Sequence, residues 1–490
     1  MKVAVVSPPL LSHNQDFFSS GIPYFPIGAA YLASTLREKG FEVSVVDAFG
    51  EAFNKIRDYK KKALIQGLKP EEVVKKIPSD VDWICFYAPL VTSHPLNLEL
   101  IPVVKKAFPK AKTLVFENSQ QVYAYALKEV YKEFLDLGVD FVVMGEPEER
   151  VVEVLNGKHS SDGLAFVREG KQVLVPKKIF SVIKELDALP YPAFDLFPLK
   201  NYWRMGYSHA PFSGKYVPML SSRGCPYGCK FCVIPATNQR LWRFRSAKSI
   251  VDEMQYWKEK LGVTDFHWMD LNPTVRKDRM IEMSKLILER GLKITFKFAT
   301  GTKIETFDAE TLEWMAKAGC VYISFSPESG SPRVLKLMDK PFSHEHALKM
   351  TRRMNELRVY SQACFVLGFP GETKDDLKQS WNYLKELTKA GLDEASLFIE
   401  APVPGAEATP SLPGEVTDLA DVTFSPTFRP DFKSLSSFRN NLYNHFFYWK
   451  LRYYPLKVLK SFFNVLRRRF DIKMEMTFWR LLKVKFLYRL

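Results

Sequence analysis

Three closely spaced cysteines are the residues whose pattern points most directly to chemistry. Cys225, Cys229 and Cys232 lie in the segment Cys-Pro-Tyr-Gly-Cys-Lys-Phe-Cys. Thiolates this close in one loop wrap a single metal centre, and soft sulfur ligands suit iron–sulfur clusters or zinc. Zinc would need a fourth protein ligand, and neither Cys nor His follows at finger-like spacing. The spacing therefore favours an iron–sulfur cluster with one open iron over zinc or structural thiols.

Three further segments carry polar or glycine residues directly after predicted strands: 269–274, 327–331 and 368–373. Gly368 permits close backbone approach to a nucleoside-like ligand. Two acidic residues have simpler alternatives. Asp270 suits a turn or helix cap, and Glu372 opens a sequence typical of a helix start.

The segment from Val217 to Pro404 alternates apolar runs with helix-length patterns such as 246–261 and 308–318. Six βα units in succession predict a partial barrel of parallel strands, with its chemistry at their carboxyl ends. Cys320 and Cys364, in or beside these runs, are expected to be small core residues. The predicted strands are 217–221, 265–269, 295–299, 321–326, 362–367 and 394–399.

The first 155 residues also alternate, with strands predicted at 2–6, 42–46, 83–87, 113–116 and 141–144, and helices at 27–39, 96–108 and 120–137. Continuous apolar strands separated by helices indicate a doubly wound α/β domain. Ligands on such a sheet lie beyond the carboxyl ends of the strands. We interpret residues 156–210 as a linker that contains several prolines and one hairpin, whose strands are 164–168 and 172–175.

Together these features resemble the cobalamin-dependent (class B) radical S-adenosylmethionine (SAM) family over about residues 1–410. The cysteine spacing matches its cluster signature, and the N-terminal domain matches through Pro8-Pro9 and segments 25–33, 46–48 and 145–148. The resemblance implies an α/β fold: a Rossmann-like cobalamin-binding domain at 1–155, a linker at 156–210 and a partial (β/α)6 barrel at 211–410. Beyond it, apolar and cationic residues interleave over helical stretches, which predicts an α-helical region at 411–490. It also implies three cofactors: a [4Fe–4S] cluster on the three cysteines, SAM and cobalamin.

The resemblance further implies contacts for individual residues. Phe231 would lie near the adenine of SAM, Asp270 and Asn272 near its amine, Glu328 and Ser329 near its ribose, and Gly368 near its nucleoside. Cobalamin would contact Pro8, Pro9, Thr92, Asn118, Ser119, Gly145 and Glu146.

The sequence departs from the family pattern in two places. No Asp-x-His-x-x-Gly motif occurs, so no histidine is expected to bind cobalt from below, and residues 117–121 replace a Gly-Gly-x-His element. His94 follows the third predicted strand; it would either approach the corrin or be a solvated loop histidine.

The formal charge of +15 is unevenly distributed. Residues 431–490 contain 14 Lys or Arg against 3 Asp or Glu, so this segment carries +11 of it. The catalytic body is nearly balanced, which argues against a nucleic-acid groove. The tail is also rich in aromatic residues, which suits either a membrane interface or a helical cap on the barrel. Scattered cysteines, no apparent signal segment and no apolar run of about 18 residues predict a cytoplasmic protein, with peripheral contact at the inner membrane face.

The family resemblance implies the following reaction. One electron, from a donor such as flavodoxin or ferredoxin, cleaves SAM to a 5′-deoxyadenosyl radical, and methylcobalamin then methylates an unactivated carbon. The basic, aromatic tail favours a small, lipid-like substrate. Oxidation, cyclisation or carbon–carbon coupling is the alternative outcome. A methylthiotransferase is disfavoured because the N-terminal domain lacks three extra cysteines, and a non-catalytic sensor because the SAM-facing segments are retained.

Overall fold

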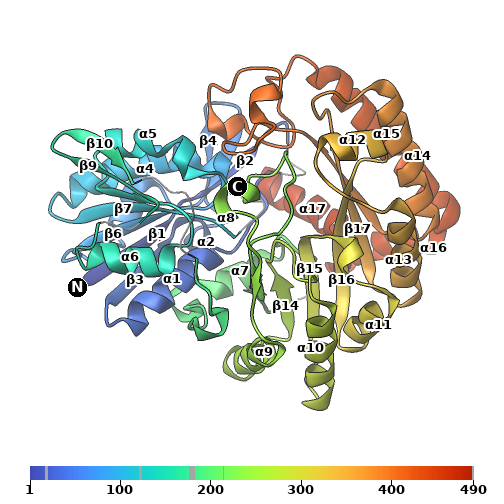
Figure 1. Ribbon diagram of the computed structural model, residues 1–490, viewed down its shortest axis with the longest axis horizontal. Helices are drawn as coiled ribbons and strands as arrows, with labels where there is room; N and C mark the ends of the chain where they lie inside the picture. Colours follow the sequence, from blue (N-terminus) through green and yellow to red (C-terminus); the bar gives the residue numbers. More distant parts are fainter. Residues whose placement is uncertain (17–19, 121–123, 160–161, 176–181, 213, 488–490) are drawn as a thin grey trace.

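The structure is a computed structural model that describes residues 1–487 except 17–19, 121–123, 160–161, 176–181 and 213. In Figure 1 the N-terminal sheet domain, blue to green, lies beside the barrel, green to orange. The C-terminal helices, red, lie against the barrel. The class is mixed α/β, as the sequence predicts.

The N-terminal sheet has the strand order β10-β9-β8-β7-β6-β1-β3. Helices cover both faces: α1 and α6 pack with the core that includes Val3 and Val5, and α3, α4 and α5 with the core that includes Ala4 and Val6. This confirms the doubly wound domain. Its parallel strands are β1 (Lys2–Ser7), β3 (Glu42–Asp47), β6 (Trp83–Ala88), β7 (Lys112–Glu117) and β8 (Phe141–Val143). The helices are α1 (Ile27–Glu38), α3 (Pro70–Val74), α4 (His94–Ala107), α5 (Tyr131–Asp136) and α6 (Pro147–Leu155).

Three details of this domain differ from the sequence-based expectation. The hairpin of β9 (Leu164–Arg168) and β10 (Lys171–Leu174) exists but extends the N-terminal sheet by antiparallel pairing with β8. A small antiparallel sheet of β2 (Leu10–His13), β5 (Ala63–Gln66) and β4 (Ile56–Tyr59) is additional. The helix expected at 120–137 is confined to α5 and a 3-10 turn at Leu127–Glu129.

The barrel sheet is fully parallel in the order β11-β14-β15-β16-β17-β18. Six strands in sequential order, each separated by helix, confirm the partial (β/α)6 architecture. The strands are β11 (Tyr216–Met219), β14 (Asp265–Trp268), β15 (Thr295–Thr302), β16 (Cys320–Glu328), β17 (Tyr360–Leu367) and β18 (Glu394–Ile399). The principal helices are α9 (Ala247–Leu261), α10 (Lys277–Glu289), α11 (Ala309–Lys317), α13 (His344–Glu356) and α14 (Lys374–Lys389).

The C-terminal region consists of α15 (Phe432–Tyr453), α16 (Pro455–Arg467), α17 (Lys473–Leu482) and a π-helical turn at Lys483–Leu487. The start of α17 enters the barrel between the amino ends of its strands. There the backbone N–H groups of Lys473 and Met474 donate to the buried carboxylate of Glu394. The tail therefore closes the floor of the barrel. Among the described helices, none has the length and hydrophobicity that crossing a membrane requires.

Candidate active site

The three cysteines lie on the loop between β12 (Ser222–Arg223) and α8 (Ile234–Asn238), at the carboxyl end of the barrel. All three are half-buried and free of disulfides. Two backbone hydrogen bonds hold the loop: the N–H of Cys232 donates to the carbonyl of Cys229 at 3.1 Å, and the N–H of Lys230 donates to the carbonyl of Met338 at 3.0 Å. The expected cluster ligands thus share one short, anchored loop.

Two lysines, each ion-paired with a glutamate, flank this loop. The Nζ of Lys303 lies 4.8 Å from the ring centroid of Tyr227, and that of Lys340 lies 5.7 Å from the ring of Phe231. Burial raises the pKa of Cys225 to about 11, and both lysines act in the opposite direction. Nearby cations favour thiolates and hence an anionic cluster. Among the described residues no three His, Cys, Asp or Glu side chains converge on one point, so the thiols must turn toward a common centre to hold iron.

Asp270, expected near the SAM amine, is fully buried and hydrogen-bonded within the protein. The N–H of Ser221 donates to both carboxylate oxygens at 3.0 Å, and the hydroxyls of Ser221 and Ser222 donate at 2.7 and 2.6 Å. Arg279 also holds Ser221 in place, because its Nη1 donates a hydrogen bond to the carbonyl of Ser221 at 2.7 Å. Asp270 therefore positions the segment that leads into the cysteine loop.

Asn272, two residues on, has a different environment. Its backbone carbonyl accepts from Trp242 Nε1 at 2.9 Å, which fixes the segment. Its side-chain Oδ1 is buried and has no hydrogen-bond donor among the described residues. A buried acceptor without a donor is costly unless a ligand supplies one. The amine of SAM is a group of that kind, so Asn272 fits the expected role.

Glu328 closes β16 in a left-handed backbone conformation, φ 61°, which a non-glycine residue adopts only when its surroundings enforce it. Lys340 Nζ donates to its Oε1 at 2.5 Å, and both side chains are almost completely buried. Glu400 follows β18 nearby and is only 6% exposed; no described group donates to its carboxyl. Burial and then the charge of Glu328 raise the pKa of Glu400 well above its usual range. Of these two carboxyls at the barrel mouth, that of Glu328 is ion-paired with Lys340, and that of Glu400 has no ion-pair partner among the described residues.

The remaining expected SAM contacts lie around the same mouth. Ser329 is buried, and its hydroxyl lies 3.2 Å from that of Ser380. Gly368 has φ 76°, and its N–H donates to Glu372 Oε2 at 2.6 Å. Burial raises the pKa of Glu372 to about 7. Helix α14 is capped by a capping box of Thr373 and Asp376, so Glu372 stabilises the glycine turn and does not cap the helix.

The carboxyl-end edge of the N-terminal sheet contacts this mouth directly. Asn238 Nδ2, just beyond the cysteine loop, donates to the carbonyl of Ser119 at 2.6 Å. Glu146 pairs with Arg243 at 2.6 Å, and Arg223 pairs with the buried Glu148 at 2.6 Å. Both buried ion pairs cross the domain boundary, so the expected cobalamin edge and the cluster loop form one site.

Other residues of this edge serve its local structure. The carboxylate of Glu117 accepts from the N–H groups of Leu127 at 2.7 Å and Gly145 at 2.5 Å. Asn118 Nδ2 donates to the carbonyl of Pro89 at 2.8 Å. Pro8 and Pro9 are buried and Thr92 is half-buried; these three also lie at the edge.

His94 is not a solvated loop histidine, so that interpretation is wrong, whereas its approach to the corrin stays a prediction. It begins α4, is 1% exposed, and its Nδ1 lies 3.0 Å from the hydroxyl of Tyr125. Its Nε2 lies 3.2 Å from Glu133. Cys320 is a buried core residue as expected, whereas Cys364 is half-buried.

The chemistry of the domain boundary suits a ligand rich in carboxamides. Gln120 Oε1 and Gln239 Nε2 are buried there without hydrogen-bond partners among the described residues. An amide group both donates and accepts, so the carboxamide arms of a corrin match this acceptor and this donor. Because Ser119 and Asn238 touch, a corrin between them requires that contact to open. Residue 121, the last residue of the segment 117–121 that departs from the family pattern, lies outside the described residues.

Comparisons with known proteins agree with this geometry. The model of the radical SAM superfamily matches residues 219–384. A cytidylyl-2-hydroxyethylphosphonate methyltransferase from Streptomyces wedmorensis is 27% identical over 441 residues, 81% of this chain and 80% of that protein. Residues 219–384 thus match the radical SAM superfamily, and most of the chain is similar to a methyltransferase.

Solved structures of cobalamin-dependent radical SAM enzymes share the fold of this chain. The radical SAM methyltransferase TsrM from Kitasatospora setae, solved with cobalamin and a [4Fe–4S] cluster, has a TM-score of 0.61 at 17% identity, covering 83% of this chain and 74% of that chain. The cobalamin-dependent radical SAM enzyme OxsB, solved with aqua-cobalamin and SAM, has a TM-score of 0.62 at 16% identity, covering 90% of this chain and 56% of that chain. Both likenesses extend across the N-terminal domain and the barrel of this radical SAM protein.

The structure also brings in residues that sequence patterns missed. Lys340 and Glu400 belong to the barrel mouth, and Lys473 donates from the C-terminal tail to the carbonyl of Ala299 at 2.6 Å inside the barrel. Glu400 had a usable signal, since it follows the last predicted strand. Lys340 and Lys473 had none, because each reaches the barrel from outside the strand ends.

Proposed function

We propose that this radical SAM enzyme methylates an unactivated carbon of a small hydrophobic molecule. The observation that carries the proposal is the joint site: the cysteine loop, the unpaired acceptor of Asn272 and the carboxyl of Glu328 meet the strand-end edge of the N-terminal sheet. Bound there, a [4Fe–4S] cluster, SAM and cobalamin supply one-electron SAM cleavage and a transferable methyl group.

The chain's own residues have separate tasks in this proposal. Cys225, Cys229 and Cys232 hold the cluster, and Asn272 accepts a hydrogen bond from the SAM amine. Phe231, Glu328, Ser329 and Gly368 contact its nucleoside, and Asp270 holds the loop. The cobalamin contacts remain those expected from the sequence, namely Pro8, Pro9, Thr92, Asn118, Ser119, Gly145 and Glu146.

Methylation is preferred because two relatives that span most of the chain, at 26–27% identity, carry that activity in their names. Besides the phosphonate methyltransferase, an uncharacterised methyltransferase of Pyrococcus horikoshii is 26% identical over 83% of this chain. The rival outcome, ring closure or oxidation, has one specific support. An anaerobic magnesium-protoporphyrin IX monomethyl ester cyclase from Rubrivivax gelatinosus is 23% identical over 83% of this chain and 70% of that protein.

We also propose the type of substrate, the electron donor and the cellular location of the reaction. The substrate is hydrophobic and lipid-like, the electron donor is a flavodoxin or ferredoxin, and the enzyme works in the cytoplasm at the inner membrane face. The basic, aromatic C-terminal region supports this setting, since apolar and cationic side chains together suit an anionic lipid surface.

The test is a product analysis with isotopically labelled SAM. Anaerobically reconstituted enzyme is incubated with reductant, cobalamin, methyl-labelled SAM and a lipid extract, and products are analysed by mass spectrometry. We expect a labelled methyl group on a lipid-soluble product and about one cobalt per chain. Cys229→Ala should give no product, whereas the matched core variant Cys320→Ala should retain it. Unlabelled, dehydrogenated or cyclised products would favour the rival reaction.

A further inference from the structure

Helix α16 packs on the barrel through polar side chains. We call Lys457, Lys460 and Asn464, together with Asp393 and Asp471, which they contact, the polar seat. Lys457 Nζ lies 2.8 Å from Asp393 Oδ1, and Lys460 Nζ lies 2.8 Å from Asp471 Oδ2. Asn464 Nδ2 donates to the same Asp471 oxygen at 2.8 Å. These residues recur at the spacing of one helix face, so a single side of α16 faces the barrel floor.

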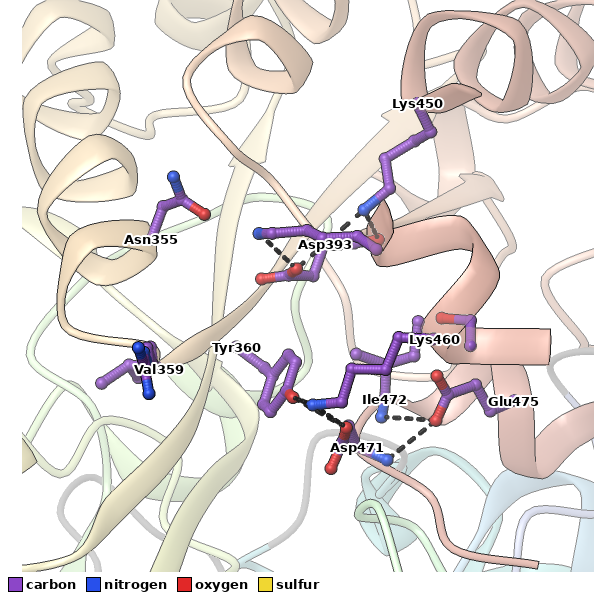
Figure 2. A pocket seen from close by; sticks show the side chains of 12 residues that line it. Asn355, Val359, Tyr360, Asp393, Lys450, Lys460, Asp471, Ile472 and Glu475 are labelled. Atoms are coloured by element: carbon purple, nitrogen blue, oxygen red, sulfur yellow. Dashed lines mark hydrogen bonds and ion pairs between the residues drawn. The ribbon is translucent and has the colours of Figure 1, made fainter. Parts of the chain in front are cut away.

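Figure 2 shows this polar seat, where Lys460 and Asp471 approach Tyr360 and dashed lines join Glu475 to the backbone beside Asp471. The seat borders a cavity of about 180 Å³ at the amino ends of β17 and β18. Asp393, which receives Lys457, is 4% exposed. Rolling the helix would remove the closer of the two lysines from that buried carboxylate and leave it only Lys450 at 3.9 Å, which is unfavourable. The seat therefore fixes which side of α16 points outward.

The outward side is a stripe of large apolar residues. Leu456 is 78% exposed, Leu459 51%, Phe462 59%, Phe463 43% and Leu466 63%, and no residue of α16 is buried. At 3.6 residues per turn these positions fall within an arc of about 120°, which is separate from the arc of about 60° that carries Lys457, Lys460 and Asn464. This reverses the usual arrangement of a surface helix, in which the apolar side packs inward.

The surroundings of the stripe are apolar or cationic. The two acidic residues between 447 and 487, Asp471 and Glu475, are both hydrogen-bonded at the polar seat. The other exposed residues of this segment are Phe447, Tyr448, Leu451, Arg452, Pro455, Lys460, Arg467, Arg468, Arg469, Phe478, Lys485, Phe486 and Leu487. No exposed residue described in this segment is acidic or uncharged polar, apart from the hydroxyl of Tyr448.

We propose that α16 lies in the plane of an anionic lipid bilayer, with Leu456, Leu459, Phe462, Phe463 and Leu466 inserted below the headgroups. An interfacial helix of this kind buries its apolar face about 5–10 Å into the headgroup and acyl boundary. Arg452, Arg467, Arg468 and Arg469 then meet lipid phosphates, which a neutral protein partner would not match. The inference deepens the proposed membrane setting and rests on it, but not on the reaction in the barrel.

The test compares vesicle flotation of the full-length protein and its variants. Vesicles contain either phosphatidylcholine alone or phosphatidylcholine with phosphatidylglycerol. The probe variant is Leu456→Ser/Leu459→Ser/Phe462→Ser. The matched control is Leu288→Ser, which removes an apolar side chain of 43% exposure from α10. Circular dichroism and sedimentation give fold and oligomeric state, and 5′-deoxyadenosine formation without vesicles gives the basal chemistry.

We expect the unaltered protein and Leu288→Ser to float with the anionic vesicles, less at high salt and less with phosphatidylcholine alone. The triple variant should bind at least about tenfold more weakly, with unchanged fold and unchanged SAM cleavage. Equal flotation of the triple variant, no flotation of the unaltered protein, or equal binding to both vesicles would overturn the proposal. So would a dimer that the triple variant converts to monomer. SAM cleavage without flotation refutes the docking and the membrane setting but not the reaction, whereas flotation without SAM cleavage refutes only the reaction.

Discussion

Replacing Asp270 tests whether this residue positions the cysteine loop, as the structure indicates, or contacts SAM directly, as the sequence predicted. In the structure its carboxylate is fully buried and accepts from three donors on Ser221 and Ser222. Asp270→Asn removes the charge, and three hydrogen bonds change from charged to neutral. At about 1 kcal/mol lost per bond, unfolding should become easier by about 2–3 kcal/mol. Asp270→Ala leaves three buried donors unpaired and should cost about 3–6 kcal/mol.

The assay combines chemical denaturation with iron and sulfide analysis after anaerobic reconstitution. Because Ser222 leads into the cysteine loop, we expect both variants to lose cluster content together with stability, Ala more than Asn. Glu310→Gln, on the exposed start of α11, serves as a carboxylate control. If the Asp270 variants keep full stability and full cluster content and lose only SAM binding, the positioning role is refuted. The direct contact between Asp270 and SAM is then the better explanation.

Two further predictions concern the barrel mouth. Burial raises the pKa of Glu372 to about 7, so its contribution to stability is complete below the unfolded pKa of about 4.5 and is lost as pH rises to about 7. In Glu372→Gln the free energy of unfolding should therefore vary less over that range, and an unchanged pH profile would contradict the assignment. Lys340→Met leaves Glu328 buried without its cation and should destabilise the protein by about 3–5 kcal/mol. Adding Glu328→Gln should recover most of that loss, and a double variant as unstable as the single one would argue against the pair.

The sequence predicted the elements whose periodicity is strong. Each barrel strand appears within a few residues of its expected bounds, because long apolar runs in parallel sheets are distinctive. The cysteine loop and the segments at Asn272, Glu328 and Gly368 follow those strands, so their common location could be inferred from chain order alone.

What the sequence could not supply depends on tertiary contacts. The N–H of Met269 donates to the carbonyl of Met219, which places Asp270 beside Ser221, and no local pattern reports that register. Likewise the N–H of Ala126 donates to the carbonyl of Pro404 at 3.0 Å, which holds this segment outside a helix. The sequence predicted an α-helical C-terminal region, but only the salt bridges of α16 reveal which of its sides faces outward.

The most direct test of the central claim is the amount of 5′-deoxyadenosine formed from SAM by the reconstituted protein under strong reductant. We expect 5′-deoxyadenosine and methionine to form in a reaction that depends on the reductant and disappears in Cys229→Ala. No 5′-deoxyadenosine from protein with a full complement of iron and sulfide would contradict the claim that this barrel cleaves SAM.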